Sequence, residues 1–489
     1  MKSKMPKFSP SKASFFIILL LLIISNFLWV YSMRDRIVLS FHKARFPYQA
    51  QGLNTFEKGI SKCFLAFNSF KRTITGPDED PWDDSQVNKR IMKYRTAKVI
   101  LIINNAAGKP LSQLPVTICQ VRHKFLFGCR IDPVNLFKEN TQQHLFEEIF
   151  NYATLPFFWG LYEGIEGQTD YKRIRTIANW CNKRMITTKG HPLIWQLVVP
   201  WWLWVKKTNE VEASLWFRVQ REVKEFATLI DKWDVVNEPS TALASALYGY
   251  SPICRLYHDI GRLNLLEKAF AIAHKSNPRS TLVLNDFVVG DYYKNLIADC
   301  LESGVEIDVI GLQSHMHKKI WSLDSMWDVC ERFSHFGKPL HFTEITVLSG
   351  KLMSGTDEDW YNIRNDWSTS REGERRQTEA VRKFYRLLFS HPAVEAITWW
   401  GFSDAGSWMG APAGLLRKDM SPKPVYGVLK KLIKDDWWTG PLKLKTDYEG
   451  RISFRGFLGD YVIESEKGRA QIVIDQAGKI EKTIHVTLP

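Results

Sequence analysis

The chain has 489 residues, of which 45% are hydrophobic and 13% aromatic, a composition typical of a folded protein rather than a disordered one. The formal net charge is +14, and half of it lies in the first 45 residues, where eight lysines and arginines accompany one aspartate. The rest of the charge is spread without a basic run, which argues against a nucleic-acid-binding protein. The length suggests about three domains, but one large domain with appendages also fits, since a (β/α)8 barrel alone takes about 250 residues.

Residues 15 to 31 form an apolar run after four lysines. The run is long for the core of a signal peptide and short for a membrane span, so both interpretations stay open. Val30 and Ser32 fit a cleavage site, whereas Trp29, Tyr31 and the lysines fit an uncleaved anchor. A buried core helix is disfavoured because the run is not amphipathic. Residues 1 to 32 are therefore expected to be a signal peptide or membrane anchor, which makes the rest extracytoplasmic and limits membrane contact to this segment.

Two regions of short β pattern flank the middle of the chain. Residues 33 to 95 lack a clear period and are interpreted as a linker or lead-in. Residues 96 to 124 are predicted to be a small β element with strands at 98 to 104 and 116 to 121. Residues 437 to 489 are predicted to be a C-terminal β appendage, with strands at 451 to 454, 461 to 463 and 471 to 474.

Residues 125 to 436 alternate short apolar strands with segments of helical period. The predicted strands are 125 to 131, 150 to 156, 185 to 195, 232 to 238, 280 to 286, 309 to 315, 339 to 345 and 395 to 401. Apolar stripes between them predict helices, namely Tyr171, Ile174, Ile177 and Cys181; Val219, Val223, Phe226 and Ile230; Leu296, Ile297, Cys300 and Leu301; and Val381, Phe384 and Leu388.

The strands are apolar on successive residues, as parallel strands covered by helices on both faces must be. Eight of them predict a closed (β/α)8 barrel of the α/β class. A doubly wound open sheet is disfavoured, because no glycine-rich phosphate loop follows the first strand.

Polar and aromatic side chains are concentrated at the carboxyl ends of the predicted strands, where barrel enzymes keep their chemistry. They are His191 and Trp195 from the third strand, Asn237 and Glu238 from the fourth, Gln313 and His315 from the sixth, Glu344 from the seventh and Trp400 from the eighth. A glutamate at a strand end is often a solvated loop residue. The apolar strand that ends in Asn-Glu-Pro favours function instead, because burying two polar groups there would be costly unless they are used.

The two glutamates predict glycoside cleavage. That reaction needs one carboxyl group to protonate the leaving oxygen and another to attack or stabilise the anomeric carbon. Carboxyl groups about 5 to 5.5 Å apart would retain the configuration, and a larger gap would invert it. Indole rings and hydrogen-bonding groups around them suit a sugar ring.

Each of the other candidates also has a simpler interpretation. His315 and His317 could hold a metal, but nearby carboxylates lack a ligand-like spacing and the reaction needs none, so no metal or cofactor is predicted. His191 could be a satisfied barrel histidine, and the tryptophans could belong to the core. The seven cysteines show no Cys-x-x-Cys and no metal-ligand spacing, and are interpreted as buried thiols, at least one of them unpaired.

At these residues the chain resembles glycoside hydrolase family 10, the endo-1,4-β-xylanases with a (β/α)8 barrel. The resemblance covers roughly residues 125 to 430. It rests on WDVVNE at 233 to 238, GHPLIW at 190 to 195, Asn285-Asp286, IGLQSH at 310 to 315, FTE at 342 to 344 and HPAVEAITWWGFSDAGSW at 391 to 408.

The resemblance implies roles for the site residues. Glu238 would be the general acid/base and Glu344 the nucleophile of a retaining mechanism, while Asn237 would hold the sugar 2-hydroxyl. The side chains that would line the subsite of bond cleavage are His191, Trp195, Gln313, His315 and Trp400, with Trp408 flanking the adjacent subsite. His315 or Gln313 would orient Glu344.

Three positions depart from the family pattern. Residues 155 to 159 are apolar where the family usually has a Glu-Asn pair and a lysine, Gln196 stands where a histidine often follows the tryptophan, and Thr346 stands where an aspartate is common. The leading hypothesis is a monomeric, retaining, endo-acting hydrolase of xylan-type β-1,4-linked polysaccharide. The alternatives are a hydrolase of another β-1,4-glycan and a non-catalytic polysaccharide-binding protein on the same barrel.

Overall fold

A computed structural model describes residues 80–131, 140–242, 251–354 and 367–485. The predicted signal or anchor segment, most of the lead-in and Cys63 lie outside the described residues. Within the described ranges, no helix has both the length and the apolar character needed to cross a membrane.

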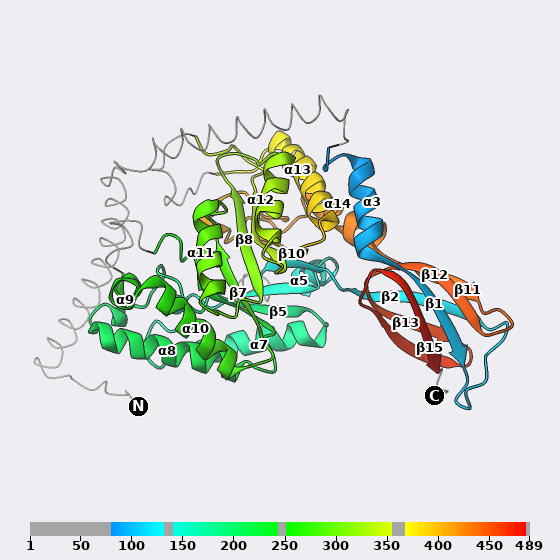
Figure 1. The fold of residues 1–489 in the computed structure, drawn as a ribbon. Helices are drawn as coiled ribbons and strands as arrows, with labels where there is room; N and C mark the ends of the chain where they lie inside the picture. The colour runs from blue at the N-terminus through cyan, green and yellow to red at the C-terminus, as the bar shows by residue number, and fades with distance from the viewer. Residues whose placement is uncertain (1–79, 132–139, 243–250, 355–366, 486–489) are drawn as a thin grey trace, which may run out of the picture. The chain divides into compact units, whose positions relative to one another are not determined.

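In the described part of the chain, eight parallel strands close into a barrel in the order β10-β3-β4-β5-β6-β7-β8-β9. Figure 1 labels β5, β7, β8 and β10 of this barrel. Their bounds are β3 Leu126–Arg130, β4 Tyr152–Pro156, β5 Thr187–His191, β6 Lys232–Asn237, β7 Thr281–Asp286, β8 Val309–Met316, β9 Leu340–Val347 and β10 Val394–Trp399. The predicted barrel is thus confirmed. Its apolar runs are buried as expected, and every residue of β9 is buried.

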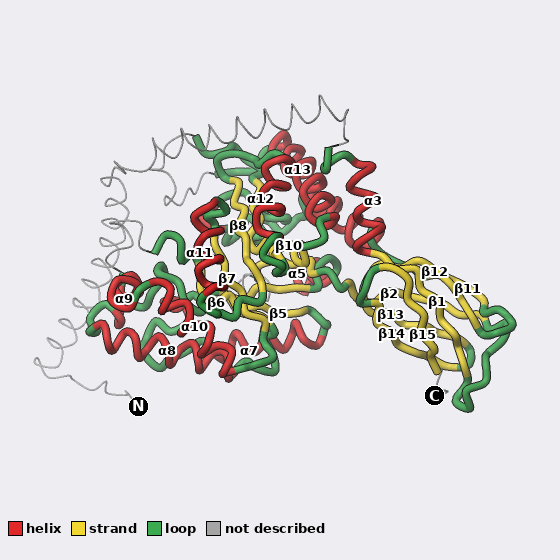
Figure 2. Tube along the Cα trace, in the orientation of Figure 1, coloured by secondary structure: helices red, strands yellow, loops and turns green. Residues whose placement is uncertain are grey.

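Helices follow most of the strands and pack around the barrel (Figure 2). The helices of the barrel region are α5 Asn140–Glu147, α6 Trp159–Tyr162, α7 Tyr171–Lys183, α8 Thr208–Glu225, α9 Pro252–Ile260, α10 Arg262–Ser276, α11 Asp291–Glu302, α12 Leu323–Ser334, α13 Arg371–Ser390 and α14 Pro424–Lys430. Short helical turns occur at Trp201–Leu203, Trp408–Gly410 and Lys431–Asp436. Three of the apolar stripes predicted from the sequence lie on α7, α11 and α13. Of the fourth, Val219 and Val223 lie on α8, whereas Phe226 and Ile230 follow its end at Glu225. The residues of all four stripes pack against the core.

One glycine shows how tightly the barrel interior is filled beside the site. Gly190 lies just before His191, and a Cβ atom there would come within 2.1 Å of the ring of Trp233 on the next strand. Only glycine leaves room for this fully buried indole. The close contact fixes the end of β5, from which His191 extends.

The segments before and after the barrel form one β module of two sheets. The first sheet has the order β12-β1-β15 and the second β11-β2-β13-β14. Their strands are β1 Thr96–Asn104, β2 Pro115–His123, β11 Leu442–Lys445, β12 Arg451–Phe457, β13 Gly459–Ser465, β14 Gly468–Ile474 and β15 Gly478–His485. β1 and β2 each pair only with C-terminal strands among the described residues. A shared apolar core explains the pairing, with Val99, Leu101 and Ile118 against Ile452 and Ile463.

The lead-in ends in a helix that the sequence analysis does not predict, α3 Asp84–Arg95. Its signal was weak because few of its residues are apolar, and only Val87, Ile91 and Arg95 are buried. Arg95 donates hydrogen bonds to the carbonyl groups of Phe389, 2.6 Å away, and Val394, 2.7 Å away. The helix is thus fastened to the barrel by a buried guanidinium group.

Candidate active site

The end of β6 presents Glu238 through an unusual backbone conformation. The strand stops at Asn237, and Glu238 adopts a φ of +57°, in the left-handed region that side chains other than glycine rarely occupy. The amide of Glu238 still donates to the carbonyl oxygen of Asn285, 2.7 Å away on β7. Gln196 supports the same turn, since its Nε2 donates to the carbonyl oxygen of Glu238 at 3.1 Å. Strain held by neighbouring elements is typical of functional residues.

Glu238 is buried among hydrogen-bond donors. Trp195 Nε1 donates to its Oε2 at 2.9 Å, and Gln313 Nε2 donates to its Oε1 at 3.1 Å. Burial raises the pKa of Glu238 to about 8, and the neighbouring charge of Glu344 acts in the same direction. The carboxyl group therefore keeps its proton near neutral pH, as a general acid must.

Glu344, on β9, has the opposite electrostatic environment. Burial alone would raise its pKa, but the influence of His191 and a hydrogen bond from His315 outweigh that effect, and the pKa lies below its usual value. His315 Nε2 lies 3.1 Å from Glu344 Oε2, and Asn285 Nδ2 donates to Oε1 at 3.0 Å. Glu344 is therefore ionised at a pH where Glu238 is still protonated. Two neighbouring carboxyl groups with opposite pKa shifts divide the roles of acid and nucleophile.

A chain of amide side chains joins the two glutamates. Gln313 Nε2 donates to Glu238 Oε1 and, at 3.2 Å, to Asn237 Oδ1. Asn285 Nδ2 donates to the same Asn237 oxygen at 2.7 Å and to Glu344. The carboxyl groups thus belong to one hydrogen-bonded network at one end of the barrel. Asn285, fully buried, is its central member.

His191 is held from behind by a buried ion pair. Its Nδ1 lies 2.7 Å from Asp234 Oδ2, and Lys189 Nζ lies 2.7 Å from the same oxygen. Burial raises the pKa of Asp234, but Lys189 and His191 outweigh this and lower it. Because a carboxylate only accepts, Nδ1 carries the proton and Nε2 faces Glu344 Oε1, 3.8 Å away.

Thr346 takes the place of a carboxylate behind His315. His315 Nδ1 lies 2.8 Å from the hydroxyl oxygen of Thr346. Since Nε2 must carry the proton that is donated to Glu344, Nδ1 accepts from the hydroxyl group. The threonine therefore fixes the ring and tautomer of His315 without adding a negative charge.

Aromatic rings surround the two glutamates. The ring of Trp400 packs edge-on at 5.1 Å from that of His191, and Trp408 lies 5.2 Å from that of His315. Phe158, from the apolar segment after β4, lies 5.5 Å from His191. Trp408 keeps 40% of its surface exposed, so its ring is available for stacking on a sugar.

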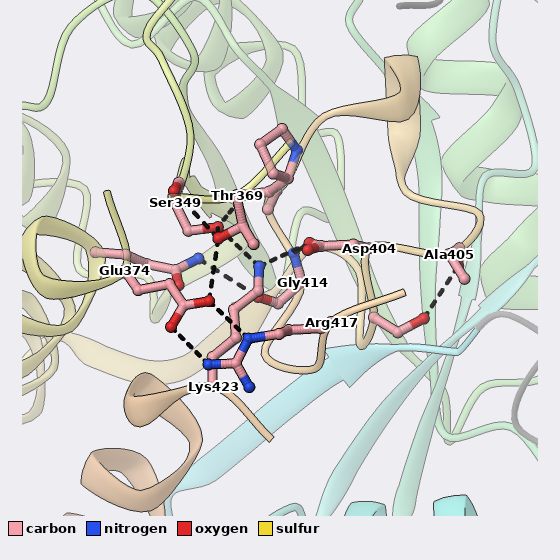
Figure 3. Close-up of polar contacts among 12 residues, drawn as sticks. Ser349, Thr369, Glu374, Asp404, Ala405, Gly414, Arg417 and Lys423 are labelled. Carbon is pink, nitrogen blue, oxygen red and sulfur yellow. Dashed lines mark hydrogen bonds and ion pairs between the residues drawn. The ribbon is translucent and has the colours of Figure 1, made fainter. Parts of the chain in front are cut away.

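The loop that carries Trp408 is anchored by a buried polar network (Figure 3). Lys423 Nζ donates to Asp404 Oδ1 at 2.7 Å and to the hydroxyl group of Ser349, just beyond β9, at 2.8 Å. The same Oδ1 of Asp404 also accepts a hydrogen bond from the backbone amide of Gly414 within the loop, at 2.8 Å. The lysine thereby ties both ends of the loop to the barrel.

A second ion pair extends this anchor to α13. Arg417 donates to both oxygens of Glu374, from Nε at 2.8 Å and from Nη2 at 2.7 Å. Thr369 links the two parts, because its hydroxyl group donates to Ser349 at 2.8 Å and to Glu374 at 3.2 Å (Figure 3).

The nine residues expected from the sequence all lie in this region. They are Glu238, Glu344, Asn237, His191, Trp195, Gln313, His315, Trp400 and Trp408. Trp195 ends the third predicted strand, but it lies beyond the observed one, because β5 already ends at His191. Sequence reasoning quoted Asn285 as part of the family resemblance but gave it no role in the site, and it gave none to Asp234 and Lys189, which look like ordinary strand residues. Among the described residues, no three candidate metal ligands form a cluster.

The model of one protein family, described as glycosyl hydrolase family 10, matches residues 119–432 of the chain. The chain belongs to glycosyl hydrolase family 10. The resemblance stated from the motifs is thereby confirmed, and the protein is a glycoside hydrolase.

Characterised relatives and a solved structure agree with the family. Endo-1,4-beta-xylanase B of Thermotoga neapolitana is 28% identical over 269 residues, which are 52% of this chain and 71% of the relative. Endo-1,4-beta-xylanase 1 of Arabidopsis thaliana is 25% identical over 409 residues, 81% of this chain but only 38% of the relative. Native xylanase 10B of Thermotoga maritima aligns with a TM-score of 0.54 and 24% identity, over 64% of this chain and 96% of that one, which shows the shared fold.

Proposed function

We propose that this glycoside hydrolase cleaves internal β-1,4 bonds of xylan-type polysaccharide with retention of configuration. The observation that carries the proposal is the pair of buried carboxyl groups with opposite pKa shifts, joined by one amide network. The family supports the reaction class. The names of the two relatives, both endo-1,4-beta-xylanases, support the substrate.

In the first step, ionised Glu344 attacks the anomeric carbon while protonated Glu238 gives its proton to the departing glycosidic oxygen. A covalent glycosyl-enzyme forms and the leaving sugar departs with the proton. In the second step Glu238, now a carboxylate, takes a proton from water, whose oxygen displaces Glu344. The high pKa of Glu238 falls once Glu344 is neutralised as an ester, because part of that pKa comes from the charge of Glu344.

The remaining site residues position the sugar. Asn237, held by Gln313 and Asn285, is placed to bind the hydroxyl next to the anomeric carbon, an interaction that tightens as the transition state forms. Trp400 and Trp408 offer ring faces to neighbouring sugars. No residue in this scheme needs a metal or cofactor.

The position of Phe158 is the reason to consider a second substrate. Its ring lies against His191 and, at 5.7 Å, against Trp195, on the side where the family usually has polar groups. Fewer hydrogen bonds to the sugar there favour a relaxed choice among β-1,4-glycans. We therefore propose xylan first and another β-1,4-glycan second. Non-catalytic binding to polysaccharide is disfavoured by the intact acid and nucleophile.

The location of the protein is inferred from its N-terminal apolar segment and from the substrate. We propose that the protein acts outside the cytoplasm as a monomer, secreted or anchored through residues 1 to 32, with polysaccharide rather than nucleic acid as its partner.

The test is the release of reducing sugar from xylan, cellulose and mixed-linkage glucan by the wild type and by Glu344→Ala. We expect release from xylan by the wild type, and a loss on the order of 10⁴-fold or more in the variant. Release of sugar from another β-1,4-glycan alone would make that glycan the substrate in place of xylan. Equal activity of the two proteins on every glycan would refute the proposal that the protein is an enzyme acting through Glu344.

A further inference from the structure

A cleft lies at the end of the barrel opposite to the candidate active site. It has a volume of about 810 Å³, within the usual range of ligand sites. The first residues of several barrel strands line it, and the turn between β14 and β15, residues 475–477, lies at its edge. The cleft thus opens where the barrel meets the β module, and junctions between domains are common places for binding sites.

Two cations line this cleft. The guanidinium group of Arg122 donates from Nη2 to the hydroxyl group of Thr187, while its Nε is buried without a hydrogen-bond partner. Lys232, at the start of β6, makes one hydrogen bond, from Nζ to the hydroxyl group of Thr281 at 3.2 Å. Lys232 Nζ therefore has two of its three donors, and the buried Nε of Arg122 its one, without a hydrogen-bond partner in the described part of the protein.

Two carboxylates, Asp308 and Glu395, line the same cleft and are exposed. In the described residues, no ion pair joins either of them to Arg122 or Lys232. They are nevertheless close enough to act on Lys232: burial lowers the pKa of this lysine, and the charges of Asp231, Glu395 and Asp308 oppose the shift. Because these charged groups lie near one another without forming an ion pair, their hydrogen-bond donors and acceptors can bind a ligand in the cleft.

A buried histidine provides an independent observation. His341, on β9, lines the cleft with only 2% of its surface exposed, and its Nδ1 has no hydrogen-bond partner. An unpaired polar atom in such a place costs free energy unless a ligand satisfies it. Burial holds the pKa of His341 well below its usual value, so the ring is neutral.

The mixture of groups selects the class of ligand. The carboxylates repel an anion, and Arg122 and Lys232 repel a cation. A sugar hydroxyl group both donates and accepts, so one hydroxyl can bridge a lysine and a carboxylate that do not pair directly. The half-buried ring of Tyr94 adds a face for stacking.

We propose that this cleft is a second glycan-binding site, which takes a short neutral segment of the β-1,4-linked polysaccharide that the active site cleaves. The identity of the glycan rests on the proposed function, whereas the existence of the site does not. A chain held at the base of the barrel would keep the enzyme on the polymer. Damage to the cleft should therefore raise KM for xylan and leave the hydrolysis of a short aryl xylobioside unchanged.

Calorimetric titration with xylohexaose tests the proposal. The protein is the full chain carrying Glu344→Ala, which prevents hydrolysis. We expect two binding sites in this protein, and one site after the further changes Lys232→Met and Glu395→Gln, with at least a tenfold loss of affinity at the other. The matched control, Lys275→Met with Glu302→Gln, changes exposed residues of α10 and α11 outside the cleft and should keep both sites.

A steric variant covers the case in which the double change impairs folding. Ala477→Trp fills the cleft from an exposed turn and touches no barrel strand. It should also remove one site. A single site in Glu344→Ala, or two sites that survive both cleft variants, would overturn the proposal. Hydrolysis of xylan by the wild type is measured separately, so failure of the second site and failure of the enzyme assignment are distinguishable.

Discussion

At the scale of residues, two glutamates of equal intrinsic acidity acquire different charge states from their neighbours. Glu238 is buried beside the negative charge of Glu344, whereas Glu344 accepts from His315 and lies near His191. The chemistry follows from this asymmetry rather than from the identity of either residue.

The pKa shifts predict the pH dependence. Activity needs protonated Glu238 and ionised Glu344. It should decline as the pH rises through about 8, where Glu238 loses its proton. Activity should also decline at acid pH, where Glu344 gains a proton. Because the pKa of Glu344 is lowered, this decline should begin below pH 4.5, the ordinary pKa of a glutamate. A profile of kcat/KM against pH measures both limbs. An alkaline limb near 5 would contradict the role given to Glu238.

The same shift makes a prediction for stability. The folded pKa of Glu238 is raised, so its contribution to stability is fully present below pH 4.5 and is lost as the pH rises through about 8. Glu238→Gln removes this loss. The variant should therefore melt higher than the wild type at pH 9 and much the same at pH 4, as measured by calorimetry. A gain in Tm that does not depend on pH would contradict the burial of an ionisable acid.

Asn285 should be a positioning residue, although sequence reasoning did not select it. Asn285→Ala removes one hydrogen bond to Glu344 and one to Asn237, and it leaves the hydroxyl group of Thr343 without its acceptor. We expect kcat to fall about 10²-fold with a smaller change in KM, since both interactions matter most in the transition state. A loss confined to KM would assign Asn285 to substrate binding instead.

At the scale of elements, the loop after β10 depends on Lys423. Lys423→Met leaves the buried carboxylate of Asp404 without its counter-ion, which should cost about 3 to 5 kcal/mol of stability. The loop carries Trp408, so KM should rise together with the loss in Tm. The double variant Lys423→Met with Asp404→Leu should recover part of the stability. If the single variant were as stable as the wild type, the network of Figure 3 would not anchor the loop.

The elements also show what a sequence can predict. Long apolar runs identified the barrel strands, because burial on both faces leaves a continuous pattern. The helix α3 and the strand β15 were missed because few of their residues are apolar, and β11 was missed because it has only four residues. Glu238 and Glu344 could be found because Glu238 directly follows one strong apolar strand and Glu344 lies in the carboxyl half of another, which continues to Val347. The ion pair of Lys189 and Asp234 could not be predicted, because the two residues come from different strands and meet only in the closed barrel.

At the scale of the whole molecule, the chain closes on itself through the β module. β1 and β2 precede the barrel, and all of their sheet partners among the described residues follow it. The module therefore cannot form until the barrel segment has been made. The pairings of β1 and β2 with the C-terminal strands join residues far apart in sequence, and such pairings form slowly relative to local structure.

Removal of residues 437 to 489 tests this dependence. The truncation leaves β1 and β2 without partners and exposes apolar side chains such as Val99, Leu101 and Ile118. We expect the shortened chain to aggregate, measured by its soluble fraction and by light scattering. A soluble truncated chain with wild-type Tm would show that the module contributes nothing to folding.

The central claim is that Glu344 forms a covalent bond to the sugar while Glu238 supplies the proton. The most direct measurement is inactivation with a 2-deoxy-2-fluoro β-xylobioside bearing a good leaving group, followed by mass spectrometry of the digested protein. The account predicts one sugar per chain, attached to the peptide that contains Glu344. A label on another residue, or release of the α-anomer as first product without any adduct, would contradict it.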